Sequence, residues 1–110
     1  MSNWMKRAVL IFLTLISASP AFADGPIAVT LQNHRFTPNV IHVKANAPFV
    51  IRLTNKDATA DEFDSSSLKV EKVVAGGDTG DVHIRPLDPG KYPFMGEYHS
   101  ATAQGLVIAQ

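Results

Sequence analysis

The sequence predicts an all-β fold, an antiparallel β-sandwich, and three observations lead to this prediction. Short runs of residues carry apolar side chains at every second position, the spacing that gives a strand one buried face. Turn-forming stretches rich in Gly, Pro, Asn and Asp separate these runs. No stretch between them shows the period of an amphipathic helix. Strands that alternate in this way bury their apolar faces by packing two sheets together.

Each expected strand is bounded by a turn signal. The strands are expected at 27–31, 40–44, 49–55, 68–74, 81–87, 91–95 and 105–109. Within 49–55, Phe49, Ile51 and Leu53 share one face, as in a half-buried strand. The connection at 56–67, KDATADEFDSSS, is polar and longer than a hairpin needs. We predict a loop there that carries function, because long polar connections on small sandwiches commonly do.

The first 23 residues predict a secretory signal peptide. Lys6 and Arg7 precede an apolar run at 8–17, and Ala21-Phe22-Ala23 has the small-x-small pattern of a cleavage site. The apolar run is about half of the ~20 residues that a membrane-spanning helix needs. We therefore expect cleavage after Ala23, residence in the periplasm and no stable membrane insertion. Removing 23 of the 110 residues leaves 87, at 24–110, enough for one domain.

Composition excludes several functional classes. Without Lys6 and Arg7 the 10 basic residues fall to 8 against 10 acidic ones, a formal charge of −2, which argues against nucleic-acid binding. The chain has no cysteine, so disulfides, thiolate metal sites and thiol redox chemistry are excluded. It also lacks a phosphate-binding loop and the motifs of zinc proteases and serine hydrolases. An independent enzyme is not expected in a sandwich of this size.

The histidines and the acidic stretch are the candidate chemical groups. His42 and His83 lie in alternating strands and are expected at the surface, and His34 lies in a turn. His99 lies in the loop between the last two strands, two residues after Glu97. From these residues alone, a metal ligand and a loop histidine bonded to a backbone carbonyl are equally good interpretations.

The acidic residues of 56–67 have a simple interpretation as solvated loop side chains. Phe63 lies between Glu62 and Asp64, however, and an aromatic side chain in a polar loop is expected to turn inward. An inward Phe63 would fix the directions of its neighbours. Glu62 is therefore a candidate ligand at the end of the sandwich.

Two halves of the chain resemble the cupredoxin superfamily. FTPNVIHVKANAPFVIRLTNKD is similar to the N-terminal half of those domains, and LDPGKYPF, a later histidine and GLVIA are similar to the C-terminal half. The resemblance covers nearly all of 24–110 and implies a Greek-key β-sandwich. NKDATADEFDS, EKVV and YPFMGEYH most resemble EfeO-type cupredoxin-like domains. These include small periplasmic proteins of bacterial ferrous-iron uptake systems of the Ftr kind.

The resemblance also implies which positions correspond to the copper ligands of a cupredoxin. The usual cysteine falls on Gly96, and the usual C-terminal histidine falls on His99. The axial methionine falls near Ala103 or Gln104, and the first histidine falls on or beside Glu62. Only the histidine at 99 is kept in kind. A blue-copper site, which needs a thiolate and two imidazoles, is therefore not expected.

The expected metal site consists of Glu62, Glu97 and His99. Carboxylate and imidazole ligands suit divalent copper or iron better than Cu(I). Met95 neighbours the cysteine-equivalent position on a strand and should point to the opposite face. The resemblance implies a metal-binding accessory that assists Fe(II) oxidation or handover, with a periplasmic iron-binding protein and a membrane iron permease as partners. The alternative is a metal-free interaction module that docks a periplasmic partner through the acidic loop at 56–64.

Overall fold

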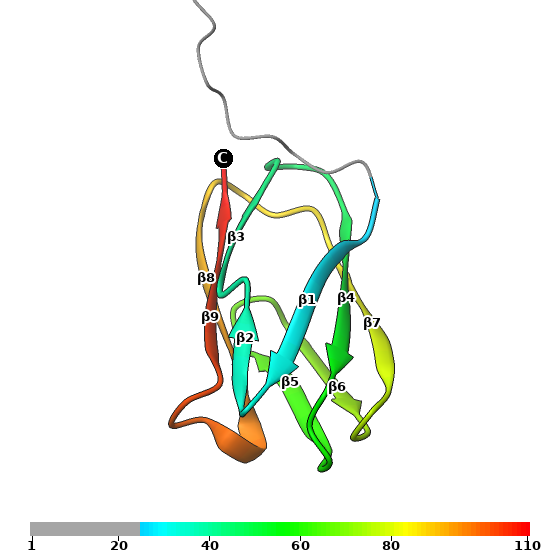
Figure 1. The fold of residues 1–110 in the computed structure, drawn as a ribbon. Helices are drawn as coiled ribbons and strands as arrows, with labels where there is room; N and C mark the ends of the chain where they lie inside the picture. The colour runs from blue at the N-terminus through cyan, green and yellow to red at the C-terminus, as the bar shows by residue number, and fades with distance from the viewer. Residues whose placement is uncertain (1–24) are drawn as a thin grey trace, which may run out of the picture.

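The computed structural model describes residues 25–110, which form two β-sheets packed face to face (Figure 1). One sheet has the order β2-β1-β4-β7 and the other has the order β3-β9-β8-β5-β6. The strands are β1 (Ile27–Gln32), β2 (Arg35–Thr37), β3 (Val40–Val43), β4 (Phe49–Asn55), β5 (Asp61–Ser65), β6 (Val70–Val74), β7 (Thr79–Ile84), β8 (Gly90–Gly96) and β9 (Gln104–Ala109), and the 3₁₀ helix η1 spans Glu97–His99. The predicted all-β sandwich is confirmed. The predicted signal peptide at 1–23 lies outside the described residues.

Both sheets are mixed, so the prediction of purely antiparallel pairing is wrong in two places. β1 pairs with β4 in parallel, and β3 pairs with β9 in parallel. The remaining pairs are antiparallel. A parallel pair needs a connection that leaves the sheet and returns, and here β2 and β3 lie between β1 and β4 in the chain. Alternation of apolar residues shows which face of a strand is buried, but it carries no information about the partner's direction.

Two strands, β2 and β5, were not expected from the sequence. β2 has three residues, too few to show a period. β5 pairs with β6 and β8, and it occupies part of the stretch predicted as a loop. Its inward residues are Asp61, Phe63 and Ser65, which are all buried. Two of these three are polar, so the strand lacks the apolar alternation that identifies its neighbours.

The core lies between the sheets and includes a cluster of three phenylalanines. Phe63 stacks on Phe94 with ring centroids 4.8 Å apart, and Phe36 meets Phe94 edge-on at 5.1 Å. Gly105 lies opposite Phe94 in the β8–β9 ladder, and a Cβ atom at 105 would overlap the Phe94 ring. Glycine at 105 therefore makes room for Phe94, the buried aromatic side chain of β8. This cluster supports the end of the sandwich where the polar groups gather.

Three separate segments meet at one end of the sandwich, the lower end in Figure 1. They are the β1–β2 turn, the connection between β4 and β5, and η1 with the loop that follows it. The C-terminus lies at the other end. None of the helices formed by residues 25–110 has the length and apolar character needed to cross a membrane. His42 and His83 are exposed, as predicted.

Candidate functional site

Asn55, the last residue of β4, shapes the connection that leads into β5. Its side chain is fully buried, and its Nδ2 donates hydrogen bonds to the carbonyls of Thr59, at 2.9 Å, and Val74, at 3.1 Å. Its Oδ1 accepts a hydrogen bond from the backbone N–H of Asp57, at 3.0 Å. All of the polar atoms of the amide are thus used. The connection is held so that Asp57 faces the β1–β2 turn and β5 begins at Asp61.

The β1–β2 turn presents two backbone N–H groups to Asp57. Asn33 and His34 are the two turn residues and have φ angles of 53° and 56°, the conformation of a tight two-residue hairpin. The Asp57 carboxylate accepts hydrogen bonds from the N–H of Asn33, at 2.7 Å, and of His34, at 2.9 Å. The His34 bond is the main cause that lowers the pKa of Asp57, and the Asn33 bond adds to it. The turn and the connection are therefore tied together through one carboxylate.

A second carboxylate, Asp61, is tied to η1. Asp61 is 2% exposed, and its Oδ2 lies 3.0 Å from Nδ1 of His99, which donates to it. Its Oδ1 accepts hydrogen bonds from the backbone N–H of Glu62, at 2.8 Å, and of Tyr98, at 3.1 Å. Three donors compensate the cost of burying this carboxylate. Asp61 thus joins β5 to η1, the two segments from which the expected metal site takes its residues.

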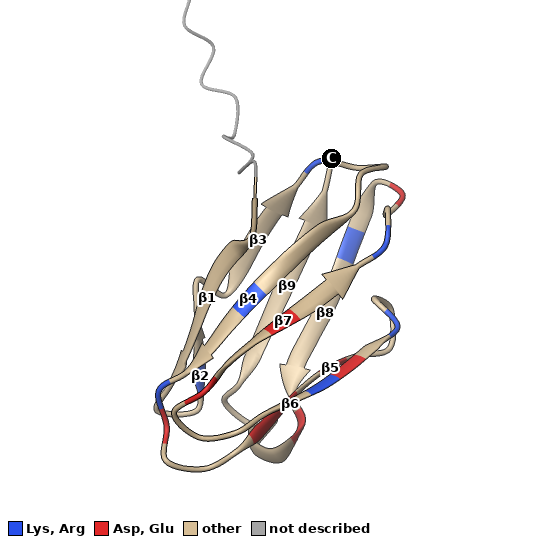
Figure 2. Cartoon of the chain, turned by 90° about the vertical axis from the view of Figure 1, so that its right-hand side faces the viewer, with Lys and Arg blue, Asp and Glu red and all other residues tan. Residues whose placement is uncertain are grey.

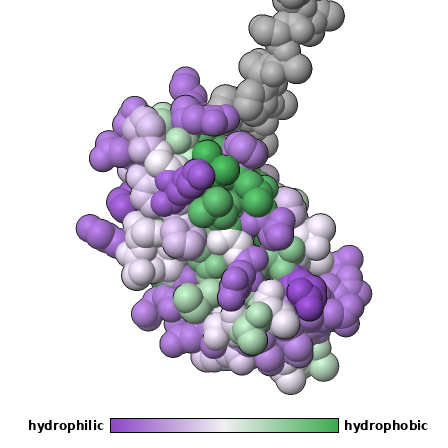
Figure 3. Space-filling model, turned by 90° about the vertical axis from the view of Figure 1, so that its left-hand side faces the viewer, coloured by the Kyte–Doolittle hydropathy of each residue, from purple (hydrophilic) through white to green (hydrophobic). Residues whose placement is uncertain are grey.

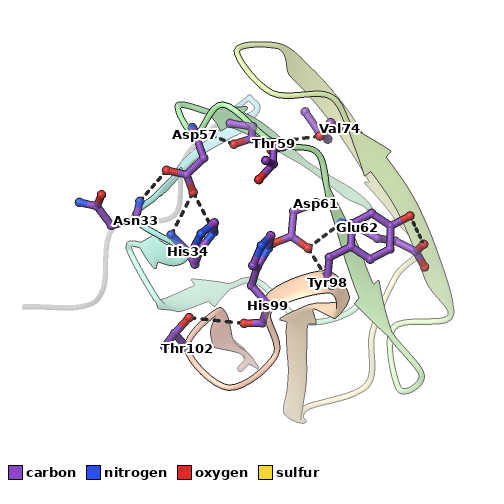
Figure 4. Close-up of polar contacts among 11 residues, drawn as sticks. Asn33, His34, Asp57, Thr59, Asp61, Glu62, Val74, Tyr98, His99 and Thr102 are labelled. Atoms are coloured by element: carbon purple, nitrogen blue, oxygen red, sulfur yellow. Dashed lines mark hydrogen bonds and ion pairs between the residues drawn. The ribbon is translucent and has the colours of Figure 1, made fainter.

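The two histidines of this end stack on each other. The rings of His34 and His99 are nearly parallel, with centroids 3.6 Å apart and an angle of 11° between them (Figure 4). Nδ1 of His34 lies 3.4 Å from Oδ2 of Asp57 but makes no hydrogen bond, although the atom is buried. We call His34, Asp57, Asp61 and His99 the histidine–aspartate cluster.

The stacked rings are poorly placed to share one metal ion. Imidazole nitrogens bind metals with lone pairs that lie in the ring plane. Because the nearly parallel rings have centroids 3.6 Å apart, an ion in the plane of one ring would lie well outside the plane of the other. The cluster, as folded, is a pair of stacked imidazole rings at the end of the sandwich, with the His99 ring hydrogen-bonded to Asp61.

Gly96, the position that corresponds to the cupredoxin cysteine, lies directly beside Asp61. A Cβ atom at 96 would lie 2.6 Å from Oδ2 of Asp61 and 2.8 Å from Cβ of Ala103. The positions to which the resemblance assigns copper ligands therefore lie together, but Asp61 occupies the space that a side chain at 96 would need. With a carboxylate, a glycine and an alanine around His99, the residues present do not fit a blue-copper centre.

A separate group of three acidic side chains lies on the outer surface next to this end. One ligand oxygen of each of Glu62, Asp64 and Glu97 lies within 4.8 Å of the others. Acidic residues of β5, β6 and the η1 loop gather here (Figure 2). The hydrogen bond with Glu62 raises the pKa of Glu97, and the negative charges of Glu62 and Asp64 raise it further. We call these three residues the carboxylate triad.

The structure divides the three residues predicted as metal ligands between these two groups. Glu62 and Glu97 come together, with Asp64 added to them, while His99 turns inward to Asp61. Tyr98 lies between the groups, since its N–H donates to Asp61 and its hydroxyl lies 3.4 Å from Oε2 of Glu62.

Two of the orientations predicted for this region are confirmed. Phe63 is fully buried, and Met95 is exposed on the outer face. The sequence reasoning missed His34, Asp57 and Asp61. Only Asp61 carried a signal, because it neighbours the position to which the first copper-binding histidine corresponds. The contacts of His34 and Asp57 depend on a turn and a connection that are 23 residues apart in the chain.

A groove of about 370 Å³ lies at the opposite end of the sandwich. It is lined by the start of β1, the end of β3 and the start of β4, including Ile27, Val43 and Phe49. Figure 3 shows apolar surface near the grey segment on the face turned to the viewer. The groove is distant from the histidine–aspartate cluster and from the carboxylate triad. β1 runs along the sandwich from the groove to the end where these two groups lie.

Comparison with known proteins relates the chain to copper proteins by fold. The structure is similar to that of auracyanin A, a blue copper protein from Chloroflexus aurantiacus, with 14% identity, a TM-score of 0.67, and coverage of 77% of this chain and 98% of that chain. It is also similar to the metal-binding domain of the Cu(I)-exporting P-type ATPase CopA of Streptococcus pneumoniae D39, with 12% identity, a TM-score of 0.68, and coverage of 82% and 91%. A purple cupredoxin from Nitrosopumilus maritimus matches with 15% identity, a TM-score of 0.61, and coverage of 76% and 99%.

Sequence comparison gives a more direct relationship. An uncharacterized protein of Rickettsia prowazekii (strain Madrid E) is 35% identical over 82 residues, which are 74% of this chain and 66% of that protein. The chain therefore spans about two thirds of the length of this relative. The family model described as "Cupredoxin-like domain" matches residues 6–109. With this match and the two-sheet fold, the chain belongs to the cupredoxin-like domain family.

Proposed function

We propose that this chain is an exported metal-binding accessory protein of ferrous-iron acquisition, and that its carboxylate triad holds the ion. The observation that carries the proposal is the convergence of oxygens from Glu62, Asp64 and Glu97 within 4.8 Å of one another. Oxygens bound to one divalent ion lie up to about twice the bond length apart, roughly 4–5 Å. A small inward movement of these side chains is enough to surround an ion.

The electrostatics of the triad support binding of a cation. The pKa of Glu97 is raised because its carboxylate would add a negative charge beside Glu62 and Asp64. A divalent cation relieves this repulsion and favours the ionised form of all three side chains.

The ligand types favour iron or divalent copper. Carboxylates prefer hard divalent ions, whereas Cu(I) prefers thiolate and thioether ligands. His99, which the sequence placed in the same site, lies two residues beyond Glu97 and would have to leave Asp61 to join it. We therefore infer that Fe(II) is bound as cargo mainly through oxygen ligands. An oxidation step would require an external electron acceptor.

The compartment and the partners belong to the same proposal. The EfeO-type resemblance supports a small periplasmic protein that works with a periplasmic iron-binding protein and a membrane iron permease. Export requires removal of residues 1–23, and the intact mass of the exported protein would show an N-terminus at Asp24. A mass that includes Trp4 would contradict export by this route.

Calorimetric titration tests the metal site. We expect Glu97→Gln and Asp64→Asn each to weaken binding of anaerobic Fe(II) at least about tenfold, roughly 1.4 kcal/mol, because each removes a charged ligand. The matched control is Asp88→Asn, an exposed acidic residue in the turn before β8, at the opposite end of the sandwich. Cu(II) titrated in parallel shows which ion the site prefers. Equal affinity in the wild type and both triad variants would remove the triad as the site.

The alternative function, a metal-free interaction module, is favoured by one specific observation. Asp61 occupies the space beside Gly96, to which the resemblance assigns the copper-binding cysteine, and it forms a hydrogen bond with His99. If the wild type binds neither Fe(II) nor Cu(II), this second function becomes the better interpretation of the fold.

A further inference from the structure

The outer face of β5, β6 and β8 carries an unusual mixture of exposed apolar and acidic side chains. Four large apolar side chains are exposed among residues 25–110, and three of them lie on or beside this face: Val73, Met95 and Tyr98. Val73 is 53% exposed, Tyr98 51% and Met95 40%. Exposed apolar side chains that cluster rather than scatter indicate an interaction surface.

Strand pairing interleaves these apolar side chains with carboxylates. Val73 lies opposite Glu62 in the β5–β6 ladder, and Glu71 lies opposite Asp64. Met95 lies opposite Asp64 in the β5–β8 pairing. Residues paired across a ladder point to the same face, and Glu62 and Asp64 point outward because Asp61, Phe63 and Ser65 point inward. The hydroxyl of Tyr98 lies beside Glu62 and extends the surface onto η1.

The acidic side chains of this face have no cationic partners. The ion pairs formed within residues 25–110 join His34 to Asp57, Arg52 to Asp81 and His99 to Asp61. None of them includes Glu62, Asp64, Glu71 or Glu97. Lys72 is in β6, but it lies opposite Phe63 and therefore faces the other side of the strand. The end of this face next to η1 thus combines carboxylates that form no ion pair with exposed apolar area, whereas Lys91 lies at the other end of β8. β6 is an edge strand that no further strand covers.

We propose that the outer face of β5, β6 and β8 docks a partner protein whose surface carries lysines or arginines around an apolar centre. Val73, Met95 and Tyr98 would contact the apolar centre, and Glu62, Asp64, Glu71 and Glu97 would meet the surrounding cations. Charge complementarity of this kind speeds association of the two proteins and fixes their relative orientation. The apolar contacts at the centre supply most of the affinity. The proposal gives the partner-binding role a surface and a partner chemistry, and it does not depend on metal binding.

The probe for this surface is cytochrome c, a protein with lysines around an apolar area. We expect residues of β5, β6 and β8 to show the largest amide shift changes when cytochrome c is titrated into labelled residues 24–110 at low salt, with a chelator present. Val73→Lys should weaken binding at least about tenfold, because it places a cation among the carboxylates. Val40→Lys is the matched control, since Val40 is 42% exposed but lies in β3, at the other edge of the same sheet.

A second variant separates docking from metal binding. The double substitution Val73→Ser and Met95→Ser removes apolar area without altering a carboxylate, so it should weaken cytochrome c binding and leave Fe(II) affinity unchanged. Glu97→Gln should weaken both. Shift changes on another face, equal effects of the two lysine variants, or no saturable binding at low salt would each overturn the docking proposal. The Fe(II) affinities of the same variants would still test the metal site, because they are measured without cytochrome c.

Discussion

Asp61 is the group that joins β5 to η1 at the end of the sandwich. It accepts hydrogen bonds from His99 and from two backbone N–H groups, and it lies against Gly96. An acidic side chain that is 2% exposed persists only when its acceptor positions are filled by donors. The loss of a side chain at 96 and the presence of a carboxylate at 61 are therefore two parts of one local arrangement.

Glu97 gives a prediction at the residue scale through its raised pKa. The hydrogen bond with Glu62 is the largest cause, the charges of Glu62 and Asp64 add to it, and Glu71 contributes least. NMR titration of the Glu97 carboxyl should therefore show a pKa above the ordinary glutamate value. Glu62→Gln should lower it markedly, whereas Glu71→Gln should lower it only slightly. Equal effects of the two variants would contradict the proposed pairing of Glu62 with Glu97.

The raised pKa of Glu97 determines how its contribution to folding stability depends on pH. A carboxyl whose pKa is raised on folding binds its proton more tightly in the folded state than in the unfolded state. Its contribution to stability is therefore greatest in acid and falls as the pH rises through the folded pKa. At neutral pH, Glu97→Gln should leave the metal-free protein at least as stable as the wild type.

At the scale of elements, β5 and the connection before it form one functional unit. Asn55 fixes the connection, Asp57 ties it to the β1–β2 turn, and β5 then alternates between a buried and an outer carboxylate, Asp61 and Glu62. A one-residue shift of β5 would exchange the inward and outward sets and destroy both groups. Phe63, packed on Phe94, prevents that shift.

Asn55→Ala tests how much of this unit depends on one amide. The substitution leaves the carbonyls of Thr59 and Val74 and the N–H of Asp57 without their side-chain partner, in a site where Asn55 is fully buried. We expect a loss of about 3 kcal/mol in the free energy of unfolding, measured by urea denaturation. Asn39→Ala, at an exposed position, is the control and should change stability by less than about 0.5 kcal/mol. A loss below about 1 kcal/mol for Asn55→Ala would contradict the role given to this amide.

At the scale of the whole molecule, the sandwich brings residues 61, 96, 99 and 103 to one point from two distant parts of the chain. These are the positions to which the cupredoxin resemblance assigns the copper ligands, and here they carry an aspartate, a glycine, a histidine and an alanine. Placing the missing copper ligands at these positions should therefore give the visible absorption of a blue-copper site. We expect the double variant Asp61→His and Gly96→Cys, which with His99 supplies two imidazoles and a thiolate, to turn intensely blue with Cu(II). The wild type loaded with Cu(II) should be nearly colourless.

Visible absorption and paramagnetic resonance of the copper-loaded proteins check this expectation. The control combines Asp61→His with Ser100→Cys, which supplies a thiol near the site but not at the convergent position. Gly96→Cys alone should be destabilised, because a Cβ atom at 96 would lie 2.6 Å from Oδ2 of Asp61. A double variant that binds Cu(II) and remains colourless would show that these positions do not correspond to the copper ligands.

The amino-acid sequence by itself determined the sandwich, the exclusion of thiolate chemistry, and the inward direction of Phe63. These depend on local alternation, on turn residues and on composition, which need no knowledge of distant contacts. The tertiary structure alone decided that two strand pairs are parallel, that the DEFDS stretch is a strand, and that His99 pairs with Asp61 rather than with Glu97. Each of these depends on which segments pack together. Asp61 and His99 are 38 positions apart. His34 stacks on His99 only because β1 ends, β5 begins and η1 lies at the same end of the sandwich.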